Sequence, residues 1–321
     1  MGRLQGKVAI ITGAGRKKGL GEGIARRFAE EGATVIITDI GKASGDHLPA
    51  NHIGTSAEME EVAEAIRAAT NGNVQTMVCD VRSEDAIVRT IADTVKQFGK
   101  LDIVVNNAGI GYIMKPLIEM SIDEWDVVLD VNLRGPFLFT KHAAKQFIAQ
   151  GEGGRIVNIA SQAAKSPAPL LVHYTSSKHG MIGLTRTAAA ELGEHGITCN
   201  AVCPNHVTTG LGAIQNARRG EVLGKDTDGV LEFRKAKIPL GRVGLATDTA
   251  NACVFLASDE AAYITGEAMT RLDETHDVAF DPNLWQNVEE LARQLHTARA
   301  IIVRNQTKVT RELIKAAPNL Q

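Results

Sequence analysis

Six short apolar runs, separated by longer amphipathic segments, are the feature that most constrains how this chain folds. The runs are nearly continuous in Val, Ile and other apolar residues, as expected of strands covered on both faces. They are KVAIIT (7–12), ATVIITD (33–39), VQTMVCDV (74–81), LDIVVNNAG (101–109), GRIVNIAS (154–161) and GITCNAVCP (196–204). Helices are expected between them, at 21–31, 56–69, 84–98, 122–149 and 173–195. This order predicts a doubly wound parallel α/β sheet, which binds ligands at the carboxyl ends of its strands.

Three segments interrupt this alternation. A long polar loop, residues 41–55, follows the second predicted strand, and residues 205–238 lack a firm apolar period, which suggests a mobile substrate lid. Near the end of the chain, apolar residues recur four and three apart from Leu284 onwards, which predicts an amphipathic helix. We therefore expect a single domain over 1–272, including the lid, and a C-terminal helical extension over 273–321 that packs on its own domain or on a partner subunit.

Composition and charge narrow the class of protein. The formal net charge of −2 over 321 residues argues against a nucleic-acid-binding protein, which usually carries a strongly basic face. No apolar run approaches the ~20 residues that span a bilayer. The N-terminus also lacks the layout of a signal peptide. The spacing of the cysteines matches neither a zinc site nor a redox pair, so we expect no bound metal. We expect Cys79, Cys199, Cys203 and Cys253 to be inert thiols in the core, as suits a protein of the reducing cytoplasm.

The first predicted strand leads into a glycine-rich turn, ITGAGRKKGLGEGIA (11–25). Glycines let the backbone approach a pyrophosphate, and the N-terminus of the following helix supplies N–H donors. Asp39 ends the second strand, where a carboxylate accepts hydrogen bonds from the adenosine ribose hydroxyls and repels a 2′-phosphate. This favours NAD as the cofactor. The cations Arg16, Lys17 and Lys18 are interpreted as a solvent-facing bulge that attracts pyrophosphate, and they keep NADP as an alternative.

Tyr174 and Lys178 lie four residues apart in HYTSSKHG, on one face of a predicted helix. A phenol has a pKa of about 10, and a nearby ammonium favours the phenolate and lowers that pKa. Such a tyrosine can donate or accept a proton near neutral pH. An isolated pair with this spacing would be an ordinary exposed helix pair, so the other motifs of the chain decide its interpretation.

Taken together, these motifs resemble the short-chain dehydrogenase/reductase family over roughly residues 6–266. Its glycine motif is matched by Thr12-Gly13, Gly19 and Gly21, and its NNAG signature by Asn106, Asn107, Ala108 and Gly109. Its catalytic tetrad is matched by Asn132, Ser161, Tyr174 and Lys178. The resemblance implies a Rossmann-type fold and an NAD(P)-dependent oxidoreductase acting on CH–OH groups.

The resemblance also implies a role for each matched residue. Tyr174 would exchange a proton with the substrate oxygen, Lys178 would lower the pKa of Tyr174 and hold the nicotinamide ribose, and Ser161 would hydrogen-bond the substrate oxygen. Asn132 would support a proton-relay water. The expected cofactor contacts are Gly13, Gly19, Leu20, Gly21, Asp39, Asp80, Val81, Asn107, Ala108, Gly109, Tyr174, Lys178, Val207 and Thr209.

Several assignments keep an alternative. Asp80 could meet the adenine edge of the cofactor or cap the next helix. Gln162 and His173 are candidate substrate contacts because they adjoin catalytic positions, and His206 is a third candidate because its loop follows the sixth strand. For each of these three, a plain packing or solvated role is the alternative.

The chain departs from the family pattern in two places. The residues 14–18 make the glycine motif longer than usual, as in the enoyl-thioester reductase branch, but the Tyr–Lys spacing does not match that branch. After Met269 the family's closing motif is replaced by TRLDETHDVAF, so terminal-strand tetramer contacts do not carry over.

Three functions follow from the sequence. The leading prediction is a cytoplasmic, NAD-dependent oxidoreductase that interconverts a secondary alcohol and its ketone. Its substrate would be a polyol, a sugar or a similar hydroxy compound, because PNHVTTGLGA and ITGEAM resemble sugar- and polyol-oxidising members. The alternatives are an NADPH-dependent 3-oxoacyl or other carbonyl reductase and a non-catalytic dinucleotide-binding scaffold. A homodimer or homotetramer is expected.

Overall fold

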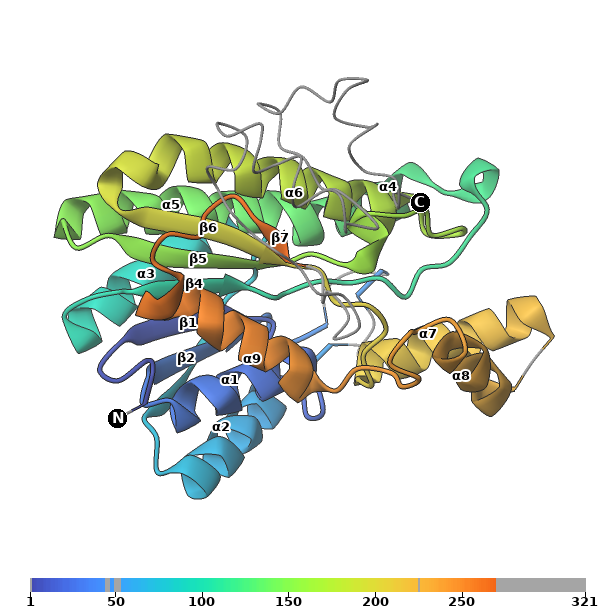
Figure 1. Ribbon diagram of the computed structural model, residues 1–321, viewed down its shortest axis with the longest axis horizontal. Coiled ribbons are helices and arrows are strands. Elements are labelled where there is room, and N and C mark those ends of the chain that lie inside the picture. The colour runs from blue at the N-terminus through green and yellow to red at the C-terminus, as the bar shows by residue number, and fades with distance from the viewer. Residues whose placement is uncertain (1, 44–46, 49–52, 225, 270–321) are drawn as a thin grey trace, which may run out of the picture. The chain divides into compact units, whose positions relative to one another are not determined.

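The computed structural model describes residues 2–43, 47–48, 53–224 and 226–269, and the predicted helical extension over 273–321 lies outside them. The described chain forms a parallel sheet in the order β3-β2-β1-β4-β5-β6-β7 (Figure 1). Strand order reverses between β1 and β4, as in a Rossmann-type sheet. The predicted doubly wound parallel fold is confirmed.

The strands coincide with the apolar runs of the sequence and pair in register. Ile11 of β1, for example, lies beside Ile37 of β2 and Val105 of β4. The runs of β1 and β2 end with their strands, whereas the other four extend past the strand ends, because the residues that follow turn away into the loops. The strands are β1 (Val8–Thr12), β2 (Thr34–Asp39), β3 (Val74–Val78), β4 (Ile103–Asn106), β5 (Gly154–Ile159), β6 (Ile197–Val202) and β7 (Ala268–Met269).

Helices cover both faces of the sheet (Figure 1). The α-helices are α1 (Leu20–Glu30), α2 (Ser56–Thr70), α3 (Glu84–Phe98), α4 (Ile122–Leu129), α5 (Gly135–Gln150), α6 (Val172–Leu192), α7 (Gly210–Leu223), α8 (Thr227–Lys235) and α9 (Ala246–Ala257). Short 3₁₀ turns are η1 (Leu117–Glu119), η3 (Gln162–Ala164), η4 (Gly193–His195) and η5 (Asp259–Ala261).

Neighbouring residues of each strand enter opposite cores. On β1, Ile11 packs in the cluster that α1, α2 and α9 cover, whereas Ile10 packs in the cluster that α3, α5 and α6 cover. Phe28 of α1 and Phe139 of α5 are fully buried in these two clusters. The continuous apolar runs are therefore explained by burial on both sides of the sheet.

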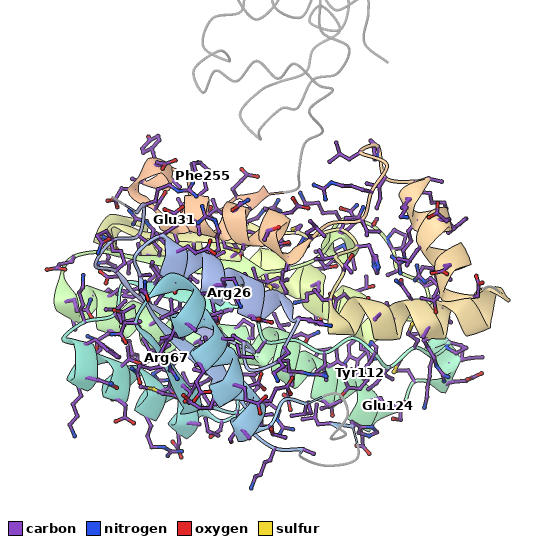
Figure 2. All side chains as sticks on the ribbon, turned by 90° about the horizontal axis from the view of Figure 1, so that it is seen from below. Arg26, Glu31, Arg67, Tyr112, Glu124 and Phe255 are labelled. Atoms are coloured by element: carbon purple, nitrogen blue, oxygen red, sulfur yellow. The ribbon has the colours of Figure 1, made fainter. Side chains whose placement is uncertain are left out.

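Hydrogen bonds also tie the helices to the sheet edge. Arg67 of α2, labelled in Figure 2, donates from Nη1 to the carbonyl oxygen of Val74 at 2.7 Å and from Nη2 to Glu60 at 2.6 Å. These bonds hold α2 beside the start of β3. The cysteines are confirmed as buried free thiols. Among the described residues, no helix has the length and apolar character needed to cross a membrane.

The segment 122–149, predicted as one helix, is divided by a π-helical turn, η2 (Asp130–Arg134). Pro136 explains part of this change, because its nitrogen carries no hydrogen to donate to the carbonyl of Asn132 one turn earlier. The side-chain amide of Asn132 is also engaged with the backbone of Ile110, at 2.8 Å in both directions. Wider π turns of this kind often occur at functional positions.

The segment 205–238 contains α7 and α8, which its irregular apolar pattern did not predict. Their N-termini are fixed by side-chain caps: Thr209 accepts a hydrogen bond from Gly212, and Asp226 accepts one from Gly229. Polar caps thus define these helices where apolar periodicity is weak. Mobility of this lid remains a prediction.

A buried polar network lies behind the carboxyl edge of the sheet. Asn106 of β4 donates to Asn158 of β5 at 2.8 Å, and Asn158 donates to Thr185 of α6 at 2.9 Å. All three side chains are buried. The network therefore joins two strands to the helix that carries Tyr174.

We expect Asn158→Ala to lower the free energy of unfolding by about 2–4 kcal/mol, because it leaves the Asn106 and Thr185 groups unpaired away from water. Chemical denaturation monitored by circular dichroism measures the change. Asn73→Ala, at an exposed position before β3, is the control and should change stability by less than about 0.5 kcal/mol. Equal unfolding midpoints for the two variants would show that the network does not stabilise the fold.

Candidate active site

The candidate site is a cavity of about 400 Å³ at the carboxyl edge of the sheet. Six consecutive strands contribute to its wall through the residues at or just after their ends: Gly13, Asp39, Asp80, Asn107, Ser161 and Pro204. The cavity spans the reversal of strand order between β1 and β4, where ligands bind in sheets of this kind.

The turns after β1 and β4 hold each other at this reversal. The Asn107 side-chain amide donates to the carbonyls of Thr12 and Gly13 at 2.8 and 3.0 Å. In return, the Thr12 hydroxyl accepts from the N–H groups of Asn107 and Ala108, both at 3.0 Å. Gly13 has a φ of +63°, and a Cβ there would lie 2.6 Å from Ala108 Cα. Glycine is therefore required, and the two motifs jointly shape the cavity floor.

The glycine-rich loop also packs against the end of β2. The N–H of Gly15 donates to Asp39 Oδ2 at 3.0 Å, and a Cβ on Gly15 would lie 2.7 Å from Asp39 Cβ. At the start of α1, a Cβ on Gly21 would lie 2.7 Å from Ala14 Cα. These close approaches fix the path of the loop, and Gly19, Leu20 and Gly21 at the start of α1 line the cavity.

The three cations of the loop divide into two groups. Lys17 and Lys18 are exposed, in agreement with a solvent-facing bulge. Lys17 forms an ion pair with Glu61 of α2 at 2.5 Å, and the N–H of Lys18 donates to Glu22 of α1. Arg16, in contrast, is half-buried, and both Arg16 and Lys17 line the cavity. The bulge is thus held by carboxylates of the two flanking helices, and it contributes two cations to the cavity wall.

Two carboxylates line the end of the cavity at β2 and β3. Burial raises the pKa of Asp39, although its oxygens accept from the N–H groups of Ile40 at 2.9 Å and Gly15 at 3.0 Å. Burial also acts to raise the pKa of Asp80, but the ion pair and hydrogen bonds with Arg82 lower it overall. Asp80 does not cap the next helix, because Ser83 is the N-cap of α3.

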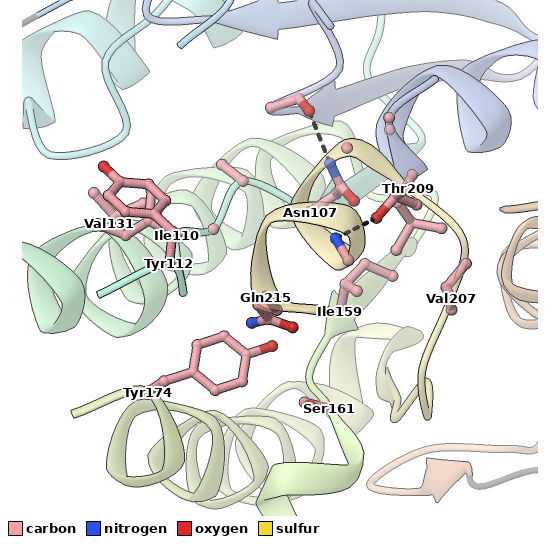
Figure 3. A pocket seen from close by; sticks show the side chains of 18 of the residues that line it. Asn107, Ile110, Tyr112, Val131, Ile159, Ser161, Tyr174, Val207, Thr209 and Gln215 are labelled. Carbon is pink, nitrogen blue, oxygen red and sulfur yellow. Dashed lines mark hydrogen bonds between the residues drawn. The ribbon is translucent and has the colours of Figure 1, made fainter. Parts of the chain in front are cut away.

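Tyr174, Lys178 and Ser161 come together at the ends of β5 and α6. Figure 3 shows Tyr174 and Ser161 in the cavity. The Lys178 ammonium lies 5.7 Å from the centre of the Tyr174 ring and donates to the carbonyl of Ile159 at 2.7 Å. Asn132 differs from the other three, because it is fully buried behind Ile110 and does not line the cavity.

The protonation balance at these groups is set by burial. Burial raises the pKa of Tyr174, and a hydrogen bond with Ser161 lowers it by a smaller amount. Burial also lowers the pKa of Lys178 to about 8. The sequence predicted that Lys178 depresses the pKa of Tyr174; in the structure, removal of the phenol from water outweighs that effect. At neutral pH the site therefore holds a phenol beside an ammonium.

All residues predicted to contact the cofactor line the cavity, as do Gln162 and His206. His173 does not, which corrects its prediction as a substrate contact. Its side chain is 0% exposed, and its Nδ1 accepts from the N–H of Tyr174 at 2.7 Å. Successive residues of a helix point about 100° apart, so the residue before Tyr174 faces the interior of the protein.

The cavity-wall residues that sequence reasoning missed include Tyr112, Gln215, Arg219 and Arg234. Gln215 donates from Nε2 to the carbonyl of Gly111 at 2.8 Å and thereby connects α7 to the loop after β4. Figure 3 shows Gln215 beside Tyr174. Gln215 and Arg219 share a helical face, but no apolar period predicted the helix on which they lie.

His206 is held neutral in the cavity wall. Its side chain is 8% exposed, and its Nε2 lies 3.0 Å from the amide nitrogen of Asn216. Burial, with Arg234 and Arg219 adding to it, lowers the pKa of His206 to about 4. Within the described ranges, no group of His, Cys, Asp and Glu residues is arranged to hold a metal ion.

Comparisons with known proteins agree with this geometry. A family model described as enoyl-(acyl carrier protein) reductase matches residues 13–271. A protein of Mycolicibacterium smegmatis named as a short-chain type dehydrogenase/reductase is 40% identical over 84% of this chain and 96% of its own length. A 3-oxoacyl-[acyl-carrier-protein] reductase of Thermotoga maritima is 36% identical over 83% of this chain and 96% of its own.

Solved structures give the same result. Carveol dehydrogenase from Mycobacterium avium in complex with NAD has a TM-score of 0.76 and 34% identity, covering 84% of this chain and 97% of that one. NAD⁺-bound xylitol dehydrogenase has a TM-score of 0.74 and 30% identity, covering 83% and 97%. The chain belongs to the short-chain dehydrogenase/reductase family, and it is an oxidoreductase acting on carbonyl or hydroxyl groups.

The neutral His206 should make stability depend on pH. Between its ordinary pKa of 6.5 and its folded value of about 4, the unfolded chain binds a proton that the folded protein excludes, so stability falls as the pH is lowered. We expect His206→Asn to weaken this fall, measured as the free energy of unfolding across that pH range. His195→Asn, at an exposed position, should keep the wild-type slope. An unchanged slope in His206→Asn would contradict the burial effect.

Proposed function

We propose that this protein is an NAD-dependent dehydrogenase that interconverts a secondary alcohol and its ketone, with Tyr174 as the general acid and base. One observation carries the proposal: the cavity that holds Tyr174, Ser161 and Lys178 also holds Asp39 at the end of β2, three strands away from β5. At about 4.8 Å per strand, the ends of β2 and β5 lie roughly 14 Å apart, a span suited to an extended dinucleotide.

The residues present fit such a cofactor. Gly13, Gly19 and Gly21 line the cavity next to the N-terminus of α1, where the pyrophosphate would bind. Asp39 would accept hydrogen bonds from the ribose hydroxyls, and Lys178 would hold the nicotinamide ribose. When bound, NAD would supply the acceptor for the hydride of the alcohol carbon.

The protein's own side chains handle the proton. Ser161 would hydrogen-bond the substrate oxygen, and Tyr174 would take the hydroxyl proton during oxidation and return it during reduction. The neutral phenol at neutral pH is ready to act as the acid for ketone reduction. Since oxidation requires the phenolate, the rate of alcohol oxidation should rise with pH. Asn132 would act by holding the Ile110 backbone at the cavity wall through its two 2.8 Å hydrogen bonds.

The substrate class within this proposal is a polyol, a sugar or a similar polar hydroxy compound. The likeness to xylitol dehydrogenase supports it, and the NAD named with both solved structures supports the choice of cofactor. The polar groups of Gln162, Gln215 and His206 in the cavity wall suit a hydroxylated substrate. A cytoplasmic location and a homodimeric or homotetrameric assembly complete the proposal, as predicted from the sequence.

A second candidate, an NADPH-dependent 3-oxoacyl or other carbonyl reductase, is favoured by Arg16. This cation lines the cavity and acts electrostatically on Asp39, so it could bind a 2′-phosphate. The 36% identity with a 3-oxoacyl reductase supports the same candidate.

The Tyr174→Phe variant tests the proposed chemistry. Without the hydroxyl the proton has no acceptor, so we expect kcat to fall by about 10²- to 10⁴-fold. NADH binding, followed by fluorescence, should be retained. The matched control is Tyr263→Phe, which removes a hydroxyl from a fully exposed side chain and should leave kcat unchanged. If Tyr174→Phe turns over like the wild type, the non-catalytic scaffold becomes the better explanation.

Cofactor preference separates the two enzyme candidates. If Asp39 excludes a 2′-phosphate, kcat/KM should favour NAD over NADP by at least about tenfold, corresponding to about 1.4 kcal/mol. Asp39→Ala should then reduce that ratio. A wild-type preference for NADP that disappears in Arg16→Ala would instead establish the reductase candidate.

A further inference from the structure

Two arginines of the lid form a cationic corner of the cavity that the proposed proton transfer does not use. Arg219 of α7 and Arg234 of α8 both line the cavity, beside His206. Burial, followed by repulsion from Arg219, lowers the pKa of Arg234 to about 10. Helices α7 and α8 pack against each other, so the two arginines face one cavity from adjoining elements.

Neither arginine has an anionic partner within the described part of the chain. The Nε of Arg234 is buried and makes no hydrogen bond to any described residue. Elsewhere, arginines of this protein pair with carboxylates, as Arg67 does with Glu60 at 2.6 Å. On α8 itself, the nearby Glu232 pairs with Lys235 at 2.6 Å. The cationic corner therefore keeps its charge while facing the cavity.

The cationic corner lies at the Tyr174 end of the cavity. Gln215 is one helical turn before Arg219, about 5–6 Å away on the same face of α7. Gln215 is bonded to the carbonyl of Gly111, and a Cβ on Gly111 would lie 2.8 Å from the Tyr174 ring. Asp39 is at the opposite end, on the far side of β1, β4 and β5. The cationic corner is therefore placed for the substrate and not for the adenosine ribose.

Two like charges held together in a partly buried wall are unfavourable until an anion neutralises them. A guanidinium presents a planar fork of donors that matches the oxygens of a carboxylate or a phosphate. We propose that Arg219 and Arg234 bind a carboxylate or phosphate group of the substrate, so that the enzyme oxidises a hydroxy acid or a phosphorylated polyol. This inference rests on the proposed function, because it assumes that the hydroxyl reacts at Tyr174.

Matched substrate pairs test the inference. We would compare 3-hydroxybutyrate with 3-hydroxybutanamide, and glucitol 6-phosphate with glucitol, by following NADH formation. In at least one pair, the anionic member should have a KM about tenfold lower or more, and the pair that responds identifies the group as carboxylate or phosphate. Arg219→Gln and Arg234→Gln should raise the KM of that anionic member about 10- to 100-fold, as expected for losing a charged hydrogen bond. The KM of its neutral partner should not change.

Arg218→Gln is the matched control, because Arg218 is an exposed residue of the same helix that does not line the cavity. It should leave every KM unchanged. The inference is overturned if the wild type uses neutral and anionic members equally well, whereas turnover of the neutral alcohol would leave the proposed function intact. It is also overturned if Arg219→Gln and Arg234→Gln weaken NADH binding about tenfold, since the pair would then bind the cofactor.

A binding measurement separates failure of this inference from failure of the proposed function. Should the wild type oxidise neither pair, thermal unfolding of the NAD-saturated protein would be titrated with the same four compounds. A rise in Tm with an anionic member that is lost in Arg219→Gln and Arg234→Gln supports the anion site even without turnover. No such rise overturns it.

Discussion

The candidate site depends on the hydrogen bonds by which the turns after β1 and β4 hold each other. Asn107 and Thr12 exchange donors and acceptors across the point where strand order reverses, and Gly13 permits the close approach. Without these hydrogen bonds, nothing in this contact would fix the turn after β1 relative to the turn after β4. The glycine-rich loop follows β1 on one side of this reversal, and Tyr174 lies on α6, which follows β5, the neighbour of β4 on the other side.

Burial governs the charges around that framework. It raises the pKa of Asp39 and Tyr174, lowers that of Lys178 to about 8, and keeps His206 neutral. Each effect has the same cause, the loss of water around the charged form. Only part of this cost is offset by local partners: Ser161 for Tyr174, and backbone N–H groups for Asp39. Ligands that supply charges and hydrogen bonds to these groups would therefore offset the remaining cost of burial.

Local patterns predicted much of the fold and the site. Continuous apolar runs located six strands because burial on both faces leaves a direct record in the sequence, and the glycine and Tyr–Lys motifs located the cavity wall. Apolar periodicity did not predict the helices correctly where a proline, a side-chain contact or a polar cap determined the local structure. Pro136 and the Asn132–Ile110 contact divided a predicted helix, and polar caps at Thr209 and Asp226 built two helices without a clear apolar stripe.

By itself, the sequence determined the parallel sheet, the glycine-rich turn after the first strand and the family, because each depends on residues close together along the chain. Only the tertiary structure decided which side chains share the cavity. It turned His173 inward, moved Asn132 behind Ile110, and brought Arg219 and Arg234 of α7 and α8 to the wall near Tyr174. The physical reason is that these placements depend on the direction of each helix and on contacts between distant segments. A single sequence carries no local signal for either.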